Sequence, residues 1–404
     1  MSEAVEVKLH IKLNVNKKKT NVLFAEAGSD FTDMLLSFLL LPLGTIVQVL
    51  EEHYGDKAPV IGSLTTLYKG ASNLDVIHFR QEDRKEELIN STLFETELRK
   101  LRLNIRGTQP TSSTSGKSYD GVFTDGAASF IISDDLYVFP NGPCPITETL
   151  TSLGIAVEDM DGMETRNVMF GRNEMIGLLR ESLISSNPLT SFIFPSRRMP
   201  VATEGHVMLP HIKPRGSVSE LDKMILKVML QKSTNKLLFA QADADFVDFL
   251  LCMLCTSLGP VEWFLRGNTG LQNMDNLYMS VAYNFYNVPQ QIFYTKELLM
   301  KPRPIECEYC NKTGYHLLMC CRYYVKGANM YMVSDDLTVS PLGLTSGLSV
   351  INELKISLSD TKEVELQIGL EEGLSLLQAA LTSTTALTDG LIKPFLKKQE
   401  QLIN

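Results

Sequence analysis

The sequence is poor in the side chains and motifs on which most enzyme and metal sites depend. Its 404 residues include only 6 histidines, which are scattered along the chain. It has no nucleophile elbow, phosphate-binding loop, dinucleotide fingerprint or His-Glu-x-x-His motif. These absences argue against the hydrolases, nucleotide-binding proteins and oxidoreductases that such motifs define. A function must therefore be sought in how the chain is built.

Positive charge and long apolar runs are also scarce. The chain has 38 Lys and Arg against 47 Asp and Glu, a formal net charge of −9, which argues against a nucleic-acid partner held through its phosphates. The longest apolar run, residues 34–50, is shorter than the roughly 20 residues of a membrane helix, and Pro42 and Gly44 interrupt it. The run predicts a buried core helix, and no membrane span is expected.

The start of the chain and the cysteines give an expectation about location. Residues 1–6 have no basic segment before an apolar core, as a secretory signal would, and they lack the Arg-rich, acid-poor character of a transit peptide. The 7 cysteines are an odd and modest number, which fits reduced thiols or metal ligands better than a disulfide framework. We therefore expect a cytoplasmic protein, with the nucleus as the alternative.

What the sequence does contain is an internal repeat. The composition, 44% hydrophobic and 21% charged, is close to globular averages, and the length predicts two or three domains. Three blocks recur in the same order, pairing residues 23–33 with 238–248, 131–138 with 332–339, and 169–174 with 367–372. The repeat predicts a first copy over residues 1–200, a linker over 201–216 and a second copy over 217–404. A stretch rich in Ser, Thr, Gly and Pro predicts a mobile loop over 106–117.

Each copy has the pattern of a small α+β unit. A β-hairpin, predicted from alternating apolar and polar residues, is followed by an apolar helix, further extended segments and a closing amphipathic helix. The predicted hairpins are residues 5–15 with 21–25 and residues 225–230 with 236–240, the extended segments include 75–80 and 128–139, and the closing helices lie near 173–185 and 371–382. Because strands and helices do not alternate regularly, the predicted fold class is α+β, built from two tandem homologous units.

Several of these blocks together resemble a known family. They are Leu23–Ala27 with Asp30-Phe31, Leu41–Gly44, the paired Ser-Asp-Asp-Leu segments, Leu381–Ser383 and Ala386–Gly390. The combination is similar to a land-plant family catalogued as domain of unknown function 674, along nearly the whole chain. The resemblance implies a plant, intracellular protein of duplicated architecture. It implies no activity and no catalytic residues, so none are transferred.

The sharpest chemical feature is Cys307-x2-Cys310, followed by Cys320 and Cys321. Two thiolates at the first spacing can hold one zinc ion from a tight turn, with Cys320 or Cys321 and His316 as further ligands. Alternatively, Cys320 and Cys321 lie on a strand, and one of them is buried as a small apolar side chain. A structural zinc ion is therefore one interpretation of this cluster, and no other cofactor is expected.

Other candidates have simpler explanations. Cys252 and Cys255 lie in an apolar stretch and are expected to pack in the core rather than to act in redox chemistry. The pairs Asp134-Asp135 and Asp335-Asp336 each follow a serine and invite an acid–base or metal-binding interpretation. A hairpin turn is favoured, because Asp carboxylates accept hydrogen bonds from nearby backbone N–H groups.

The first helix of each copy carries further acids. Ser29 or Asp30 is expected to cap the first of these helices. Asp33 and its counterpart Asp248 are explained by capping and by the helix dipole.

These observations lead to one main hypothesis and two alternatives. The main hypothesis is a non-catalytic binding or scaffold protein with a protein partner, built from an internal duplication. The first alternative is an enzyme with a ligand site in the cleft between the two copies. The second is a zinc-stabilised adaptor that uses the Cys307/Cys310 cluster.

Overall fold

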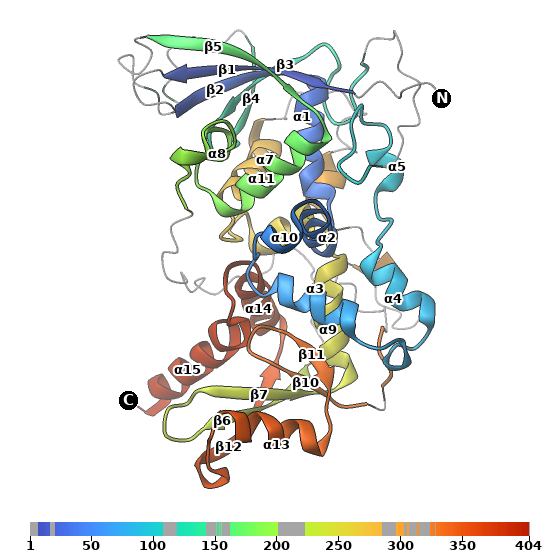
Figure 1. Ribbon diagram of the computed structural model, residues 1–404, viewed down its shortest axis with the longest axis vertical. Coiled ribbons are helices and arrows are strands. Elements are labelled where there is room, and N and C mark those ends of the chain that lie inside the picture. Colours follow the sequence, from blue (N-terminus) through green and yellow to red (C-terminus); the bar gives the residue numbers. More distant parts are fainter. Residues whose placement is uncertain are drawn as a thin grey trace.

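Two five-stranded antiparallel sheets lie at opposite ends of the molecule, with helices stacked between them (Figure 1). The structure is a computed structural model. It describes residues 7–16, 21–107, 119–142, 151, 153, 155, 162–200, 223–284, 296–302, 305–306, 313–314, 324–327 and 329–403.

The first sheet has the strand order β4-β3-β2-β1-β5. Its strands are β1 (Leu9–Asn16), β2 (Asn21–Gly28), β3 (Ser129–Ser133), β4 (Val138–Pro140) and β5 (Met163–Phe170). On β1, Leu9, Ile11 and Leu13 are buried, whereas His10 and Lys12 are exposed. This is the period of two that a sheet with one buried face requires, so the predicted hairpin is confirmed.

The second sheet repeats this topology in the order β11-β10-β7-β6-β12. Its strands are β6 (Met224–Gln231), β7 (Leu237–Ala242), β10 (Tyr331–Val333), β11 (Val339–Pro341) and β12 (Thr361–Ile368). The two sheets also share an irregularity in strand register. The β1–β2 register shifts between Asn14 and Val15, and the β6–β7 register shifts between Met229 and Leu230, which is 229 − 14 = 215 residues later. The predicted α+β class with two tandem units is thus confirmed.

The helices follow the same repeat. In the first half they are α1 (Ser29–Leu36) with η1 (Ser37–Leu40), α2 (Leu43–Tyr54), α3 (Leu64–Asn73), α7 (Arg172–Ile184) and α8 (Pro188–Ile193). In the second half they are α9 (Ala244–Cys255), α10 (Leu258–Leu265), α11 (Gln272–Asn284), α14 (Leu370–Thr382), the π-helix η7 (Thr388–Ile392) and α15 (Lys393–Ile403). The predicted closing helices correspond to α7 and α14.

The structure describes further elements besides these sheets and helices. They are η2 (Gly55–Lys57), η3 (Val76–His78), α4 (Glu82–Ile89), α5 (Glu95–Leu98), η5 (Pro195–Arg197), α13 (Leu344–Glu353), η6 (Leu358–Asp360) and the two-stranded pair β8 (Ile305–Glu306) and β9 (Thr313–Gly314). The predicted linker 201–216 and most of the predicted loop 106–117 lie outside the described residues, and the copy boundaries stay a prediction.

Two local predictions are wrong. Residues 75–80 were expected to be extended, but the Asp75 carboxylate accepts a hydrogen bond from Ile77 N at 3.0 Å and stabilises the turn of η3. Ser29 or Asp30 was expected to cap α1, but the N-cap is Gly28, which offers no side chain. Asp30 Oδ1 instead accepts from the N–H of Phe31, and Ser29 Oγ donates to the Ala128 carbonyl at 3.1 Å.

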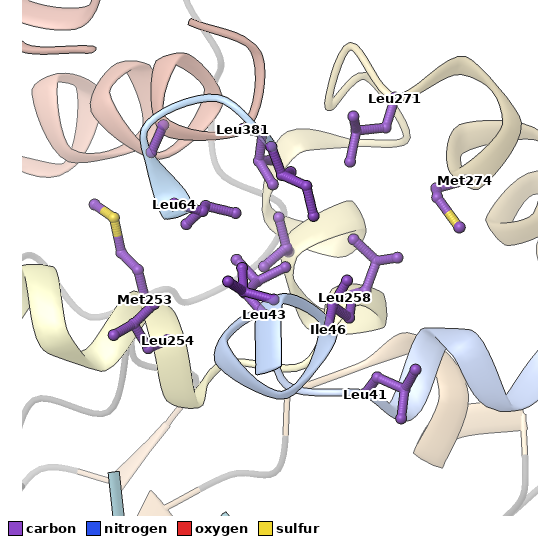
Figure 2. Packing of buried hydrophobic residues seen from close by; sticks show 14 of the residues in the cluster. Leu41, Leu43, Ile46, Leu64, Met253, Leu254, Leu258, Leu271, Met274 and Leu381 are labelled. Atoms are coloured by element: carbon purple, nitrogen blue, oxygen red, sulfur yellow. The ribbon is translucent and has the colours of Figure 1, made fainter. Parts of the chain in front are cut away.

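The two halves meet through reciprocal contacts. Leu43 N donates to Thr256 O at 3.0 Å, and Leu258 N donates to Leu41 O at 3.1 Å. Since 256 − 41 and 258 − 43 are both 215, the two hydrogen bonds are equivalent under exchange of the copies. Gly44 permits the close approach, because a Cβ there would lie 3.1 Å from the Leu254 carbonyl oxygen. Around this point, leucine, isoleucine and methionine side chains from both halves form one core (Figure 2).

Each sheet is also covered by a helix from the other half. In Figure 1, α11 of the second half lies beneath the first sheet, and α3 of the first half lies above the second sheet. Ser280 on α11 accepts from Val138 N of β4 at 2.8 Å. At the other end, a Cβ on Gly70 of α3 would lie 3.2 Å from Val339 N of β11. The halves are therefore interleaved through exchanged helices.

Candidate functional site

The two Ser-Asp-Asp segments form equivalent tight turns. Ser133 N donates to Tyr137 O at 2.9 Å, and Ser334 N donates to Thr338 O at 3.1 Å. The fourth residue of each segment is a fully buried leucine with positive φ, 65° for Leu136 and 64° for Leu337. The predicted hairpin turns are therefore present at both positions.

The first acid of each pair binds the helix that follows the closing helix. Thr190 donates to Asp134 through its backbone N at 2.7 Å and through Oγ1 at 2.6 Å. Thr388 binds Asp335 in the same way, at 2.8 Å and 2.7 Å. Burial raises the pKa of Asp134 to about 6 and also raises the pKa of Asp335. Because both oxygens of each carboxylate accept a hydrogen bond, these acids act as anchors for α8 and η7.

The second acid of each pair contacts the exchanged helix. Asn276 Nδ2 on α11 donates to the Asp135 carbonyl at 3.0 Å and to Asp135 Oδ2 at 2.9 Å. Thr66 Oγ1 on α3 donates to the Asp336 carbonyl. Within the described residues, each acid pair is thus used to hold helices rather than to face a partner acid across a cavity.

A second pair of equivalent acids lies in the first helix of each half, and here the halves differ. Asp33 is fully buried, and its carboxylate accepts from Tyr119 Oη at 2.7 Å, Val122 N at 2.5 Å and Thr124 Oγ1 at 2.8 Å. Burial raises the pKa of Asp33 to about 6, and these hydrogen bonds oppose the rise. The carboxylate holds the segment that leads into β3.

Asp248 holds the segment that leads into β10, but only through one oxygen. Oδ1 accepts from Tyr324 N at 2.8 Å and Val325 N at 2.9 Å. The side chain is 7% exposed, and Oδ2 has no hydrogen-bond partner among the residues that the structure describes. Burial raises the pKa of Asp248 to about 7, against the two amides and the positive charge of Arg80. This carboxyl group therefore titrates near neutral pH.

The surroundings of Asp248 come from both halves. Arg80 donates to Tyr324 O through its backbone N at 2.9 Å and to Val325 O through Nε at 3.0 Å. The His78 ring meets the fully buried Tyr331 ring edge-on, with centroids 6.3 Å apart. His78 Nδ1 is buried and has no hydrogen-bond partner in the described part of the chain. We call Asp248, His78, Arg80 and Tyr331 the junction site. The Asp248 carboxyl group can accept or donate a proton here near neutral pH.

Comparison with known proteins identifies a family. A family model described as protein of unknown function (DUF674) matches residues 5–113, 107–287, 295–369 and 321–403. The chain belongs to the DUF674 family. No curated protein and no solved structure matches the chain. The family likeness predicted from the sequence is thus confirmed, and the DUF674 description carries no activity.

In this DUF674 protein the predicted metal ligands Cys307, Cys310, Cys320 and Cys321 lie outside the described residues, as does His316. On either side of Cys307 and Cys310, Ile305 pairs with Gly314 and Glu306 with Thr313. Elsewhere in the described ranges, no group of three or more His, Cys, Asp or Glu side chains could hold a metal ion. The zinc interpretation stays a prediction.

Two other predictions concern apolar segments. Cys252 and Cys255 are buried in α9, and Cys255 Sγ lies 3.0 Å from Tyr324 Oη. In the described part of the chain, no helix combines the length and the apolar character that crossing a bilayer would need.

The junction site was missed from sequence, although a signal was present. Asp33 and Asp248 recur at one offset in the first helix of each half, and both were assigned to capping and to the helix dipole. An acid beside residues that pack in the core, such as Met34 next to Asp33 and Phe249 next to Asp248, needs hydrogen-bond donors from elsewhere, because burying an unpaired carboxylate is costly. That argument would have indicated a tertiary contact, but not which residues make it.

Proposed function

We propose that this DUF674 protein is a non-catalytic binding protein whose interleaved halves form a frame for a protein partner. The observation that carries the proposal is the use of the repeated acids. Asp134 and Asp335 each bind one threonine with both oxygens, and Asp135 and Asp336 each accept from a helix of the other half. The most conspicuous polar residues shared by the copies thus maintain the frame.

The exposed side of the junction site offers a surface for a partner. Val76 and Ile77 of η3 are exposed apolar side chains next to His78, and Ile77 is 64% exposed. Arg80 and Lys326 are exposed basic residues of the same strand pairing. In a chain of net charge −9, this local combination favours a protein segment with apolar and acidic side chains over a nucleic acid.

The test compares capture by two matched variants. The full chain, Ile77→Asp and Leu358→Asp would each be used for affinity capture from cells that express the protein, followed by mass spectrometry. Leu358 is a suitable control because it is 63% exposed and lies in η6, close in exposure to Ile77. We expect proteins that the full chain and Leu358→Asp retain and that Ile77→Asp loses. An identical set of captured proteins for all three would contradict the proposed surface.

A second candidate function is an enzyme that uses the junction site. Its support is the Asp248 carboxyl group, which titrates near neutral pH and has one oxygen without a hydrogen-bond partner among the described residues. Metabolite extracts would be incubated with the full chain, Asp248→Asn and the matched control Asp33→Asn, and followed by mass spectrometry. Turnover lost only in Asp248→Asn would favour this candidate, and equal profiles would reject it.

The zinc-stabilised adaptor also remains a proposal. It is supported by the Cys-x2-Cys spacing and by the paired strands β8 and β9 that flank it. Metal analysis of the purified full chain would be compared with that of Cys307→Ser and Cys310→Ser. Stoichiometric zinc that both variants lose would support the adaptor, and its absence from the full chain would reject it.

A further inference from the structure

Two buried acids face one hydroxyl group near the centre of the molecule. Glu262 of α10 is fully buried, and Asp275 of α11 is 8% exposed. Between them lies buried Thr269, whose Oγ1 is 2.6 Å from Asp275 Oδ1 and 3.3 Å from Glu262 Oε1. Thr269 N donates to the same Asp275 oxygen at 2.9 Å. The hydroxyl group and the backbone amide of Thr269 therefore both donate to Asp275.

The Thr269 hydroxyl cannot donate a hydrogen bond to both carboxylates if Glu262 and Asp275 are both ionised. A threonine hydroxyl has one hydrogen, and the shorter contact assigns it to Asp275. Glu262 Oε1 is then left facing an oxygen, and Glu262 Oε2 has no hydrogen-bond partner among the described residues. A proton on Glu262 resolves this, because the carboxyl group then donates to Asp275 or to Thr269 Oγ1.

The elements packed around the pair supply no cation to it in the described ranges. η1 and residues 373–382 of α14 contain no ionisable side chain, and Arg266 in the adjoining turn is exposed. On or against α11 the other ionisable groups are Tyr278, Tyr283, Asp135 bound to Asn276, and Lys296, whose Nζ donates to the Ala282 carbonyl in the last turn of α11 at 2.8 Å. Those on α7 are each engaged elsewhere: Arg172 donates to Ile105 O, Glu174 accepts from Gly171 N, and Arg180 pairs with Glu181. Two negative charges here would repel each other at low dielectric without compensation.

We propose that Glu262 and Asp275 share one proton and that this proton fastens the turn 266–271 and the start of α11 to the rest of the molecule. The turn contacts α14, since Gln378 Nε2 donates to Asn268 O at 3.0 Å. The start of α11 contacts α7, since Asn273 Nδ2 donates to Ser182 O at 2.9 Å and Ser185 O at 2.6 Å. Loss of the proton would loosen both contacts, one of which joins the two halves.

The direction of the effect follows from burial. Burial raises the pKa of Glu262 well above its ordinary value of 4.5, and the charge of Asp275 raises it further. The folded state therefore binds the proton more tightly than the unfolded chain does. The stabilisation is complete below pH 4.5 and is lost as the pH rises through the folded-state pKa. The first half has no such pair, because Val47 stands 215 residues before Glu262.

The test replaces the protonated carboxyl group of Glu262 by an amide, which donates a hydrogen bond at every pH. In Glu262→Gln the side-chain amide donates to Asp275 at every pH, and Glu365→Gln, which changes an exposed acid on β12, is the control. Urea unfolding of the full chain would be measured from pH 4 to pH 9. We expect the unfolding constant of the wild-type chain and of Glu365→Gln to rise, relative to Glu262→Gln, by up to about tenfold per pH unit through the titration. Parallel pH profiles for all three would overturn the proposal.

A second measurement needs no variant. Hydrogen exchange at the Thr269 amide of the wild-type chain should accelerate with pH more steeply than the intrinsic exchange rate, because ionisation of Glu262 releases the turn. A slope equal to the intrinsic one would overturn the proposal. A chelator that lowers the wild-type unfolding midpoint but not that of Glu262→Gln would also overturn it, since a cation would then occupy the place of the proton.

Discussion

Asp33 and Asp248 occupy the same place in the two halves, yet their carboxyl groups are used differently. Asp33 accepts from one backbone amide and from the hydroxyl groups of Tyr119 and Thr124, with both oxygens engaged. Asp248 accepts from two backbone amides through one oxygen. Both halves have the helix that carries the acid, but the segments that donate hydrogen bonds to the acid, before β3 and before β10, differ between the halves.

This difference indicates which parts of the duplication were free to diverge. The sheets keep the same strand order and the same register shift, because moving a strand by one residue would turn its buried side chains to solvent. The segments before β3 and β10 carry no such constraint. They need only supply hydrogen-bond donors to a buried acid, and among the described residues the second half supplies fewer. A buried carboxyl group with an oxygen that no described residue hydrogen-bonds is where new chemistry can arise, which is why we place the junction site there.

The largest expected effect is the loss of the Asp33 carboxylate. Asp33→Ala would leave three buried donors without an acceptor and should lower the free energy of unfolding by roughly 5 kcal/mol. Asp248→Ala removes the acceptor of two donors and should cost roughly 3 kcal/mol. Urea unfolding of the two variants measures the difference. If Asp248→Ala were the more destabilising, the comparison between the sites would be wrong.

The second prediction concerns pH. Because the folded-state pKa of Asp248 is raised from 3.8 to about 7, the protonated form is favoured by folding, and its stabilisation is lost as the pH rises. Relative to Asp248→Asn, the wild-type chain should lose about 2 kcal/mol of unfolding free energy between pH 5 and pH 7. In the same experiment on Asp33→Asn, the loss should level off near pH 6, where Asp33 titrates. Superimposable pH profiles of the two variants would remove the distinction.

The features that the sequence predicted depend on residues close together in the chain, and those that it did not predict depend on residues far apart. The strands around Leu13 and Leu226 and the closing helices were predicted because their signals are local periodicities. The partners of Asp248 come 76 and 77 residues later, and the Asn276–Asp135 contact joins residues 141 apart. No local pattern specifies such pairings, so the helix exchange and the junction site emerged only with the fold.

The third prediction uses the two threonines that bind the repeated acids. Thr190→Val and Thr388→Val each remove a hydroxyl donor from a buried carboxylate and keep the shape of the side chain. We expect a loss of about 2 kcal/mol for Thr190, which is fully buried, and about 1 kcal/mol for Thr388, which is half-buried. Urea unfolding measures both losses, with Thr345→Val, a change at an exposed threonine of α13, as the control. Losses no greater than the control's would show that the anchors are not needed.

Among the changes at Asp33 and Asp248, the smallest loss of stability should come from making the Asp33 site more like the Asp248 site. Tyr119→Phe removes a side-chain donor from Asp33, so its carboxylate becomes more like that of Asp248. The expected loss of stability is only about 1 kcal/mol. The pKa of Asp33 should nevertheless rise above about 6, because the Tyr119 hydrogen bond lowers it. An NMR titration of the Asp33 side chain, with Tyr137→Phe as a control, measures this shift. An unchanged pKa would mean that burial alone sets the titration of both acids, and that the difference in their donors has no part in making Asp248 titrate near neutral pH.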